Sequence, residues 1–427
     1  DSAMLQSLRT LGIQCWVGHD ARHVEAADTV VVSTAVRDDN PEVVRARELG
    51  LRLWPRSAAV QSVLTGHRAV VVTGTHGKTT TTSMLTTALL STDADPSYAI
   101  GSTLTASGLN AAAGSGDIFV VEGDESDAAI LTYEPWGAVI TNVDADHLDH
   151  FGTVAAYTEV FRTFLGRIDP GGFVVCCIDD TGAATLADEA SERGLRTVRA
   201  GRADGADLQA VRCTFLGETS QFDVRRGDAT LGRITLRVPG EHYVIDALAA
   251  LAAGLELGFS FDDLAAGLGE FRGSGRRMEF KGEAEGIRVF DSYAHHPVEI
   301  AADLAAAKTV AGKGRLVVCF QPHLFSRTKV FADQMGAALG SADEVVVMDV
   351  YRSREDPDPS VSGAMVAAAV PLAPEHVTFV PDWSQTAAEV ARRSRTGDLV
   401  MTMGAGDVTE IGPVVVALLE RRDGTSR

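Results

Sequence analysis

The chain has 427 residues, 45% of them hydrophobic and 22% charged, so at roughly 150 residues per domain it is long enough for about three globular domains. Asp and Glu outnumber Lys and Arg by 58 to 38, and the resulting net charge of −20 disfavours nucleic acid or an anionic membrane surface as a partner. No apolar run reaches the roughly 18 residues that a membrane span requires, so we expect no membrane-spanning helix.

Apolar segments alternate with stretches of helical periodicity along most of the chain. Runs that are apolar on both faces are typical of a parallel sheet covered by helices, so the sequence predicts an α/β protein. The segment Leu208–Val238 instead alternates apolar and polar residues between glycines, which favours a small antiparallel sheet. The other predicted elements are helices at Met4–Leu11, Ser57–Leu64 and Thr81–Leu90, and strands at Thr29–Ser33, Ala69–Thr73, Ile118–Val121, Ala138–Thr141, Phe173–Ile178, Arg288–Phe290, Leu316–Phe320, Glu344–Val350 and Leu399–Thr402.

A glycine-rich turn follows the second of these strands. Its residues are Gly74, Thr75, His76, Gly77, Lys78, Thr79 and Thr80. Glycines let backbone N–H groups approach phosphate oxygens, and the following helix N-terminus adds partial positive charge. Lys78 can neutralise the outer phosphates of a nucleotide, and the hydroxyl of Thr79 can ligate Mg²⁺. Val72 stands where the usual P-loop has a further glycine, so the pattern is a shortened variant; the alternative is a glycine turn that only caps a helix.

Acidic residues follow the next two predicted strands. Glu122–Asp127 ends one strand, and Thr141–Asp149, which contains His147, ends the other. The carboxyl edge of a parallel sheet is where a metal–nucleotide complex binds, and Mg²⁺ prefers oxygen ligands. Glu122 is therefore the better candidate ligand and His147 the less usual one, whereas each segment taken alone is also compatible with a solvated acidic loop.

Taken together, these motifs resemble the Mur ligase family, whose members join an amino acid to a carboxylate at the expense of ATP. The C-terminal third is similar to the branch of the family that adds L-alanine to UDP-N-acetylmuramate, and the resemblance runs from Asp1 to about Val416. The motifs that carry it there are Gly275–Arg277, Asp291–Pro297, Gln321–Thr328, Asp349–Tyr351 with Glu355–Pro357, and Gly404–Gly406.

The resemblance implies a three-domain fold. Residues 1–65 would form a Rossmann-like domain that binds the UDP-sugar, 66–274 a central P-loop domain that binds ATP, and 275–427 a C-terminal Rossmann-like domain that binds the amino acid. The glycine-rich turn, first strand and first helix of the family's N-terminal domain would precede Asp1. Ser33, Thr34 and Asn40 are then the candidate uridine-site residues.

The resemblance also implies a two-step reaction. The carboxylate of UDP-N-acetylmuramate attacks the γ-phosphate of ATP to give an acyl phosphate, and the amine of L-alanine then displaces phosphate. Transfer of a phosphoryl group needs positioning and charge neutralisation more than a protein nucleophile. By resemblance Thr79 and Glu122 hold one Mg²⁺ and His147 helps to hold a second, while Arg277 reaches the phosphates and Asp291 bonds the ribose.

Binding of the carboxylate of alanine calls for a fixed guanidinium, and Arg327 with His323 follows a predicted strand and faces the loop that carries Tyr293 and His296. The alternative for His295 and for His296 is a packed, hydrogen-bonded histidine.

Three positions depart from the family pattern. Tyr243 and Asp246 stand where relatives usually have two asparagines that contact adenine; Tyr243 can stack on the purine and Asp246 can accept from its amino group. Leu324 replaces an arginine that often assists with the amino-acid carboxylate, which leaves Arg327 as the sole anchor.

Five cysteines without a Cys-x-x-Cys spacing indicate reduced thiols and a cytoplasmic location. The chain opens without a charged and then apolar leader, so we expect no secretory signal. We expect a monomer or a homodimer. Two other functions remain open: a ligase that attaches a preformed peptide to the same nucleotide sugar, and an inactive homologue that binds nucleotide without turnover.

Overall fold

The computed structural model describes residues 3–146, 151–353 and 355–424, and the chain divides into two compact units, Asp1–Thr65 and Gly66–Arg427. In the first unit strand β1 (Thr29–Val32) pairs in parallel with β2 (Arg52–Pro55). Helix α2 (Pro41–Glu48) begins where the side chain of Asn40 accepts a hydrogen bond from the amide of Glu42, and Pro41 fills its first turn. The remaining elements of this unit are α1 (Ala3–Thr10), η1 (Ala21–Val24) and α3 (Arg56–Leu64).

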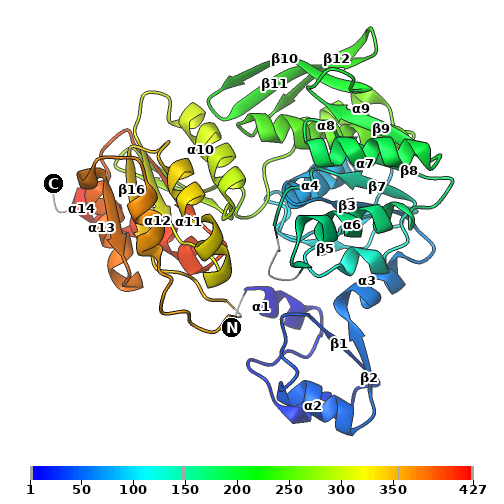
Figure 1. The fold of residues 1–427 in the computed structure, drawn as a ribbon, viewed down its shortest axis with the longest axis horizontal. Coiled ribbons are helices and arrows are strands. Elements are labelled where there is room, and N and C mark those ends of the chain that lie inside the picture. Colours follow the sequence, from blue (N-terminus) through cyan, green and yellow to red (C-terminus); the bar gives the residue numbers. More distant parts are fainter. Residues whose placement is uncertain (1–2, 147–150, 354, 425–427) are drawn as a thin grey trace. The chain divides into compact units, whose positions relative to one another are not determined.

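The second unit contains a ten-stranded sheet in the order β12-β11-β10-β9-β8-β7-β3-β6-β4-β5. Seven neighbouring strands, β10 to β4 in this order, are parallel, and β11 and β12 continue from β10 as an antiparallel end that is drawn in green in Figure 1. The strands are β3 (Arg68–Thr73), β4 (Ser97–Ala99), β5 (Ala111–Ala112), β6 (Ile118–Glu122), β7 (Gly137–Ile140), β8 (Phe173–Cys177), β9 (Arg196–Gly201), β10 (Leu208–Leu216), β11 (Thr219–Arg226) and β12 (Ala229–Leu236).

Helices cover this sheet because its central strands are apolar on both faces. Val70, Val71 and Val72 of β3 are all fully buried. Val70 and Val72 share a core with Met84 and Leu85 of helix α4 and with the alanine-rich helix α8. The helices of this part of the chain are α4 (Lys78–Leu90), η2 (Ala129–Thr132), α6 (Val154–Leu165), α7 (Thr181–Glu192), α8 (Glu241–Glu256) and α9 (Phe261–Gly269).

A six-stranded sheet follows in the order β13-β14-β18-β15-β16-β17, with only β13 antiparallel to its neighbour. Its strands are β13 (Glu279–Ala284), β14 (Ile287–Ser292), β15 (Leu316–Phe320), β16 (Glu344–Met348), β17 (Val377–Val380) and β18 (Leu399–Met403). The helices around it are α10 (Pro297–Ala311), α11 (Phe325–Leu339), α12 (Gly363–Ala369), η3 (Pro374–His376), α13 (Trp383–Arg393), η4 (Asp407–Glu410) and α14 (Ile411–Gly424).

Alternate side chains of β15 enter different cores. Val318 and Phe320 pack with residues of α10, α11 and α12, which lie side by side in Figure 1, whereas Val317 and Cys319 pack with residues of α13 and α14. This follows from the two-residue period of a strand and explains why the sequence reads as one continuous apolar run.

The predicted α/β fold class is confirmed, and every predicted helix and strand is present within a few residues of its expected bounds. Helix α4 begins at Lys78 rather than Thr81 because Gly77, in the left-handed region, already ends the turn. Strand β16 ends at Met348 because the carboxylate of Asp349 accepts the amides of Val350 and Gly363. The short strands β2, β4, β5, β9, β13 and β17 were not predicted, because polar or charged residues interrupt the apolar run in most of them.

None of the helices in the described part of the chain is both long and apolar enough to cross a bilayer.

Candidate active site

The predicted phosphate-binding turn joins β3 to α4 and is tightly packed. Gly74 has a φ of 134°, and a Cβ atom on it would lie 2.1 Å from the Oγ1 atom of Thr141. Asn142 holds the turn from the neighbouring strand end: its Oδ1 accepts the His76 amide at 2.8 Å, and its Nδ2 donates to the His76 carbonyl at 3.0 Å. The turn is therefore fixed by the segment after β7, and only glycine fits at position 74.

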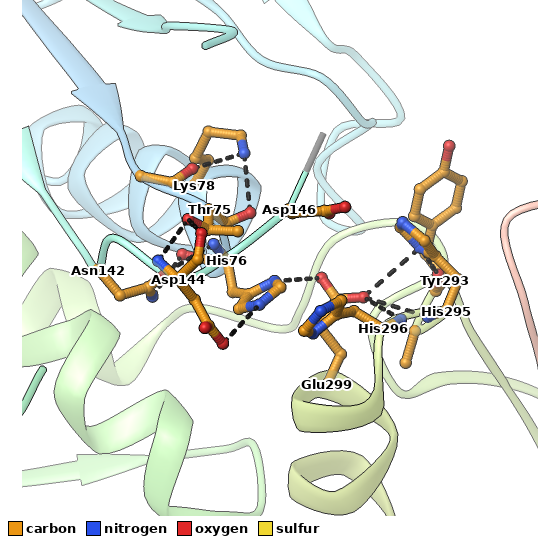
Figure 2. A network of polar contacts seen from close by, with 12 residues as sticks. Thr75, His76, Lys78, Asn142, Asp144, Asp146, Tyr293, His295, His296 and Glu299 are labelled. Atoms are coloured by element: carbon orange, nitrogen blue, oxygen red, sulfur yellow. Dashed lines mark hydrogen bonds and ion pairs between the residues drawn. The ribbon is translucent and has the colours of Figure 1, made fainter. Parts of the chain in front are cut away.

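Lys78 is the first residue of α4 and is largely buried. Its Nζ atom donates to the carbonyls of Gly74 at 2.6 Å and Thr75 at 3.0 Å, so the ammonium group lies inside the turn (Figure 2). It also forms an ion pair with the carboxylate of Glu125, 2.9 Å away, whose side chain is fully buried. The structure thus places a positive charge where the outer phosphates of a nucleotide were expected.

The two charges of this pair depend on each other. Burial opposes the charge on Lys78, but the carboxylate of Glu125 and those of nearby acids raise its pKa above the usual value. Burial raises the pKa of Glu125 to about 7, against the opposing effect of Lys78. Lys78 is therefore a permanent cation, and Glu125 is the partner that makes its burial tolerable.

The predicted oxygen ligands of Mg²⁺ lie together. The Oγ1 atom of Thr79 donates to Glu122 Oε1 at 3.0 Å, and Glu122 Oε2 accepts the amide of Gly101 at 2.7 Å. These atoms come from the start of α4 and the end of β6, which are neighbours because β3 and β6 pair in parallel. His147, the third predicted metal ligand, lies outside the described residues.

A cavity of about 300 Å³ lies beside the turn. It is lined by residues of the turn, of the segments after β7 and β8, of α8 and of the start of α10. They are His76, Gly77, Thr80, Thr141, Asn142, Asp144, Cys177, Asp179, Asp180, His242, Tyr243, Ile245, Asp246, Arg277, Ala294, Val298, Glu299, Ala302 and Asp303. Six of these, namely His76, Gly77, Thr80, Tyr243, Asp246 and Arg277, were predicted nucleotide-site residues.

Two residues of α8 form part of the cavity wall. The hydroxyl of Tyr243 donates to the carbonyl of Arg277 at 3.1 Å, and its ring lies 4.3 Å from that of His242. The carboxylate of Asp246 is buried and accepts a hydrogen bond from Thr81 Oγ1 at 3.1 Å. Burial raises the pKa of Asp246 to about 7. At neutral pH this side chain can therefore either accept or donate a hydrogen bond.

His76 lies between two carboxylates (Figure 2). Its Nδ1 atom is 3.1 Å from Glu299 Oε1, and its Nε2 atom is 3.8 Å from Asp144 Oδ2. Burial alone would lower the pKa of His76, but these two carboxylates raise it to about 9. His76 thus links the turn to α10.

Arginine and aromatic side chains gather at the start of the C-terminal sheet. The guanidinium of Arg276 is 4.9 Å from the ring centre of Tyr293 and that of Arg277 is 5.1 Å from it. Arg276 also donates to the fully buried Asp291, which accepts further hydrogen bonds from Thr402 and Thr409. Asp291 is not among the described residues that line the cavity, so its expected contact with ribose stays a prediction.

Two of the residues expected to bind the amino acid, Arg327 and His323, lie together with an acid that was not singled out. The Nη2 atom of Arg327, on α11, donates to Asp146 and lies 3.2 Å from Oδ1 and 3.3 Å from Oδ2. The Nη1 atom of Arg327 lies 3.3 Å from the Nδ1 atom of His323. Both side chains of this ion pair are more than nine-tenths buried. The ring centre of His323 also lies 5.8 Å from that of His295, in the loop that carries Tyr293 and His296.

Ser33 and Thr34 follow β1 in the first unit and are exposed. The side chain of Asn40 caps α2, as described above, so it serves a helix end in this structure. The role of these residues toward a UDP-sugar stays a prediction.

Besides Asp146, three residues of the site were missed in the sequence. Asn142 clamps the turn, Glu125 neutralises Lys78, and Glu299 binds His76. Asn142 and Glu125 lie inside segments that were recognised as acidic strand ends, so their position was visible but their partners were not. Glu299 lies in the first turn of α10, where an acidic residue is common, so the sequence did not indicate its role.

The sheet order, the glycine-rich turn and the Thr79–Glu122 pair define a nucleotide-binding ligase with Mur architecture, and the chain belongs to the Mur ligase family. Three family profiles match it: "Mur ligase family, catalytic domain" over residues 1–68, "Mur ligase middle domain" over 72–254 and "Mur ligase, glutamate ligase domain" over 276–406.

Its relatives include proteins named UDP-N-acetylmuramate–L-alanine ligase. The one from Nocardioides sp. is 56% identical over 98% of this chain and 89% of its own length. The one from Saccharopolyspora erythraea is 49% identical over 100% of this chain and 88% of its own length. Among solved structures, UDP-N-acetylmuramate–alanine ligase from Thermotoga maritima has a TM-score of 0.82 at 30% identity, and the match covers 99% of this chain and 91% of that one.

Proposed function

We propose that this chain joins L-alanine to UDP-N-acetylmuramate in an ATP-dependent reaction that forms ADP and phosphate, a step of peptidoglycan precursor synthesis. The observation that carries the proposal is the turn before α4, in which the Lys78 ammonium lies beside the Thr79–Glu122 pair at the carboxyl edge of a parallel sheet. The similarity of the whole chain to ligases with this printed activity supports L-alanine as the acceptor.

The proposed chemistry uses groups that the site already holds in place. Lys78 neutralises charge on the phosphates of ATP while the carboxylate of the sugar attacks the γ-phosphate, which suits a transition state that needs electrostatic positioning more than a protein nucleophile. Tyr243 and Asp246 hold the adenine, and Arg277 reaches toward the phosphates. The oxygen donors of Thr79 and Glu122 fit Mg²⁺, which when bound would neutralise further phosphate charge.

For the second step, Arg327 with His323 binds the carboxylate of L-alanine, and Tyr293 and His296 line the same side of the site. The amine of alanine then attacks the acyl phosphate and phosphate leaves. His147 as a further metal ligand, and Ser33 and Thr34 as contacts of the nucleotide sugar, belong to the same proposal.

We further propose that the second unit consists of two domains that meet near residue 275, so that the chain has domains at 1–65, 66–274 and 275–427. The boundary separates the ten-stranded from the six-stranded sheet. A reaction that consumes ATP and a nucleotide sugar also favours a cytoplasmic location. A monomer or homodimer stays our expectation for the assembly.

The decisive assay measures phosphate release by the purified chain with UDP-N-acetylmuramate, ATP, Mg²⁺ and L-alanine, and identifies the conjugate by mass spectrometry. Release that depends on both L-alanine and the sugar nucleotide supports the proposal. In a parallel competition, a preference for a preformed tripeptide over L-alanine would instead identify a peptide ligase. Tight ATP binding without release under any acceptor would identify an inactive homologue.

A further inference from the structure

Two histidines and an aspartate converge beside the nucleotide turn, and the reaction proposed above assigns no metal ion to them. His76 belongs to the turn, Asp144 to the segment after β7, and His296 immediately precedes α10. One donor atom from each lies within 4.8 Å of the other two. We call these three residues the His–Asp–His cluster; their side chains are labelled in Figure 2.

His296 is the unusual member of the cluster. Only 4% of its surface is exposed, and no hydrogen bond of normal length reaches either ring nitrogen from the described residues, although the side chain faces the amide of Glu299 in the capping box at the start of α10. The ring lies between those of His76 and Phe331, with ring centres 4.7 Å and 5.0 Å away. A buried imidazole whose ring nitrogens lack well-formed hydrogen bonds is costly, and a bound ion is one of the few ways to remove that cost.

His76 is oriented as a metal ligand would be. Its Nδ1–H donates to Glu299 Oε1 at 3.1 Å, which leaves Nε2 directed toward Asp144 Oδ2 at 3.8 Å. The Nε2 atom is buried and has no hydrogen-bond partner among the described residues. A carboxylate that binds the outer nitrogen of a histidine, and so fixes its tautomer and direction, is typical of metal-ligating histidines.

We propose that the His–Asp–His cluster binds a first-row transition metal ion such as Zn²⁺, at a site separate from the Thr79–Glu122 oxygen pair. Two imidazoles and one carboxylate suit Zn²⁺, whereas Mg²⁺ prefers oxygen ligands alone. Three protein ligands leave one coordination position for water or another small ligand. With bonds of about 2.0–2.1 Å in a tetrahedral site, the donor atoms must lie about 3.4 Å apart, so binding draws the side chains together by about 1 Å.

Such an ion would strengthen a connection that, among the described residues, includes the hydrogen bond of His76 with Glu299 and the ring contact of His76 with His296. It would tie the nucleotide turn to the start of α10. Because His76 and Asp144 also line the cavity, the ion would add positive charge to the cavity wall. A proton on His76 is the competitor for the same position.

The test is a calorimetric titration of the full chain with ZnCl₂ in metal-free buffer at neutral pH, compared with the variants His76→Gln and His296→Gln. We expect one ion per chain and affinity weakened at least roughly tenfold in each variant, with a smaller loss in Glu299→Gln, whose carboxylate orients His76. His376→Gln is the matched control, because His376 lies 3.1 Å from a carboxylate oxygen of Glu344 but is outside the cluster. The His376→Gln variant should bind Zn²⁺ with the same affinity as the parent.

Equal affinity in the parent and both cluster variants, or no heat at high micromolar Zn²⁺, would overturn the proposal. X-ray absorption of the Zn²⁺ complex of the unaltered chain provides a measurement that needs no variant. A shell of two imidazoles and lighter oxygen ligands is expected. A shell that contains sulfur, or oxygen alone, would place the ion elsewhere and contradict the assignment.

Discussion

Lys78 and Glu125 show how one buried charge depends on another. The ammonium group is held by two carbonyls of the turn and by a fully buried carboxylate 2.9 Å away. Removing one partner of a buried ion pair leaves the other unpaired in a medium of low polarity, which typically costs about 3–5 kcal/mol of stability. A change at Lys78 should therefore affect both the reaction and the fold.

Lys78→Met should lower the rate of phosphate release roughly a thousandfold, because one preorganised charge contributes about 3–4 kcal/mol to a transition state of this kind. It should also lower the midpoint of urea unfolding, since Glu125 stays buried without its cation. The double variant Lys78→Met, Glu125→Gln should recover most of the stability and none of the rate. A rate loss below tenfold in the single variant would mean that Lys78 is not at the phosphates.

The raised pKa of Asp246 predicts that the stability of the folded chain depends on pH. The pKa of this acid is raised from 3.8 to about 7 in the folded chain, so the folded state holds its proton more tightly than the unfolded state does. Its contribution to stability is therefore greatest below pH 4 and is lost as the pH rises from about 4 to about 7.

Asp246→Asn cannot ionise and keeps an oxygen for the hydroxyl of Thr81. It should melt at a higher temperature than the parent at pH 8, and the difference should shrink steadily as the pH falls toward 4, as measured by differential scanning fluorimetry across this range. Asp228→Asn, at an exposed position of the turn after β11, should show no such trend. A constant difference at all pH values would contradict the raised pKa.

At the scale of elements, the turn between β3 and α4 is fixed by its neighbours more than by its own bonds. Gly77 has a φ of 79°, and a Cβ atom there would lie 2.6 Å from Asp246 Oδ1 on α8. Gly194, in the turn after α7, has the same φ of 79° but no atom within 4 Å of such a Cβ. Substituting alanine at both positions therefore distinguishes the effect of backbone strain, which the two share, from the effect of crowding, which occurs only at Gly77.

Gly77→Ala and Gly194→Ala should each lose about 1–2 kcal/mol of stability from the left-handed backbone. Only Gly77→Ala should also displace Asp246, and we expect its KM for ATP to rise at least roughly tenfold, equivalent to about 1.4 kcal/mol. Steady-state kinetics with varied ATP check this. An unchanged KM in Gly77→Ala, or an equal rise in Gly194→Ala, would contradict the crowding argument.

At the scale of the whole molecule, a buried ion pair joins residues 181 positions apart in the sequence. Arg327 on α11 donates to both carboxylate oxygens of Asp146, which follows β7 of the other sheet. If Arg327 also binds the carboxylate of L-alanine, as proposed, the amino acid must compete with Asp146 for the same guanidinium.

The variant Asp146→Asn should therefore be less stable than the parent in buffer, because Arg327 loses its buried partner. Added L-alanine should raise the melting temperature of the variant more than that of the parent, because the competing carboxylate is gone. L-alanine amide, which lacks the carboxylate, should give neither protein this gain. Thermal melts with increasing ligand check the prediction. The same gain in the double variant Asp146→Asn, Arg327→Gln would show that Arg327 does not bind the amino acid.

Much of the site was visible in the sequence because its chemistry is local. The turn from Gly74 to Thr80 has its glycines, lysine and threonines in one segment, and Glu122 ends the next strand of the sheet. Parallel strands bring their carboxyl ends to one edge, so the Thr79–Glu122 contact followed from topology. The partners of Asp291 and the Arg327–Asp146 pair could not be predicted in this way, since they depend on how distant segments pack.

The order of residues along the chain thus determined the α/β class, the strands and helices, the glycine-rich turn and the types of side chain at each strand end, because these follow from periodicity and short-range sterics. Tertiary structure alone decided which distant charges meet. Glu125 beneath Lys78, Asp146 at Arg327, and the convergence of His76, Asp144 and His296 each join segments that no local pattern relates. Their pKa values and their proposed metal affinity come from that burial and proximity, which a sequence does not encode locally.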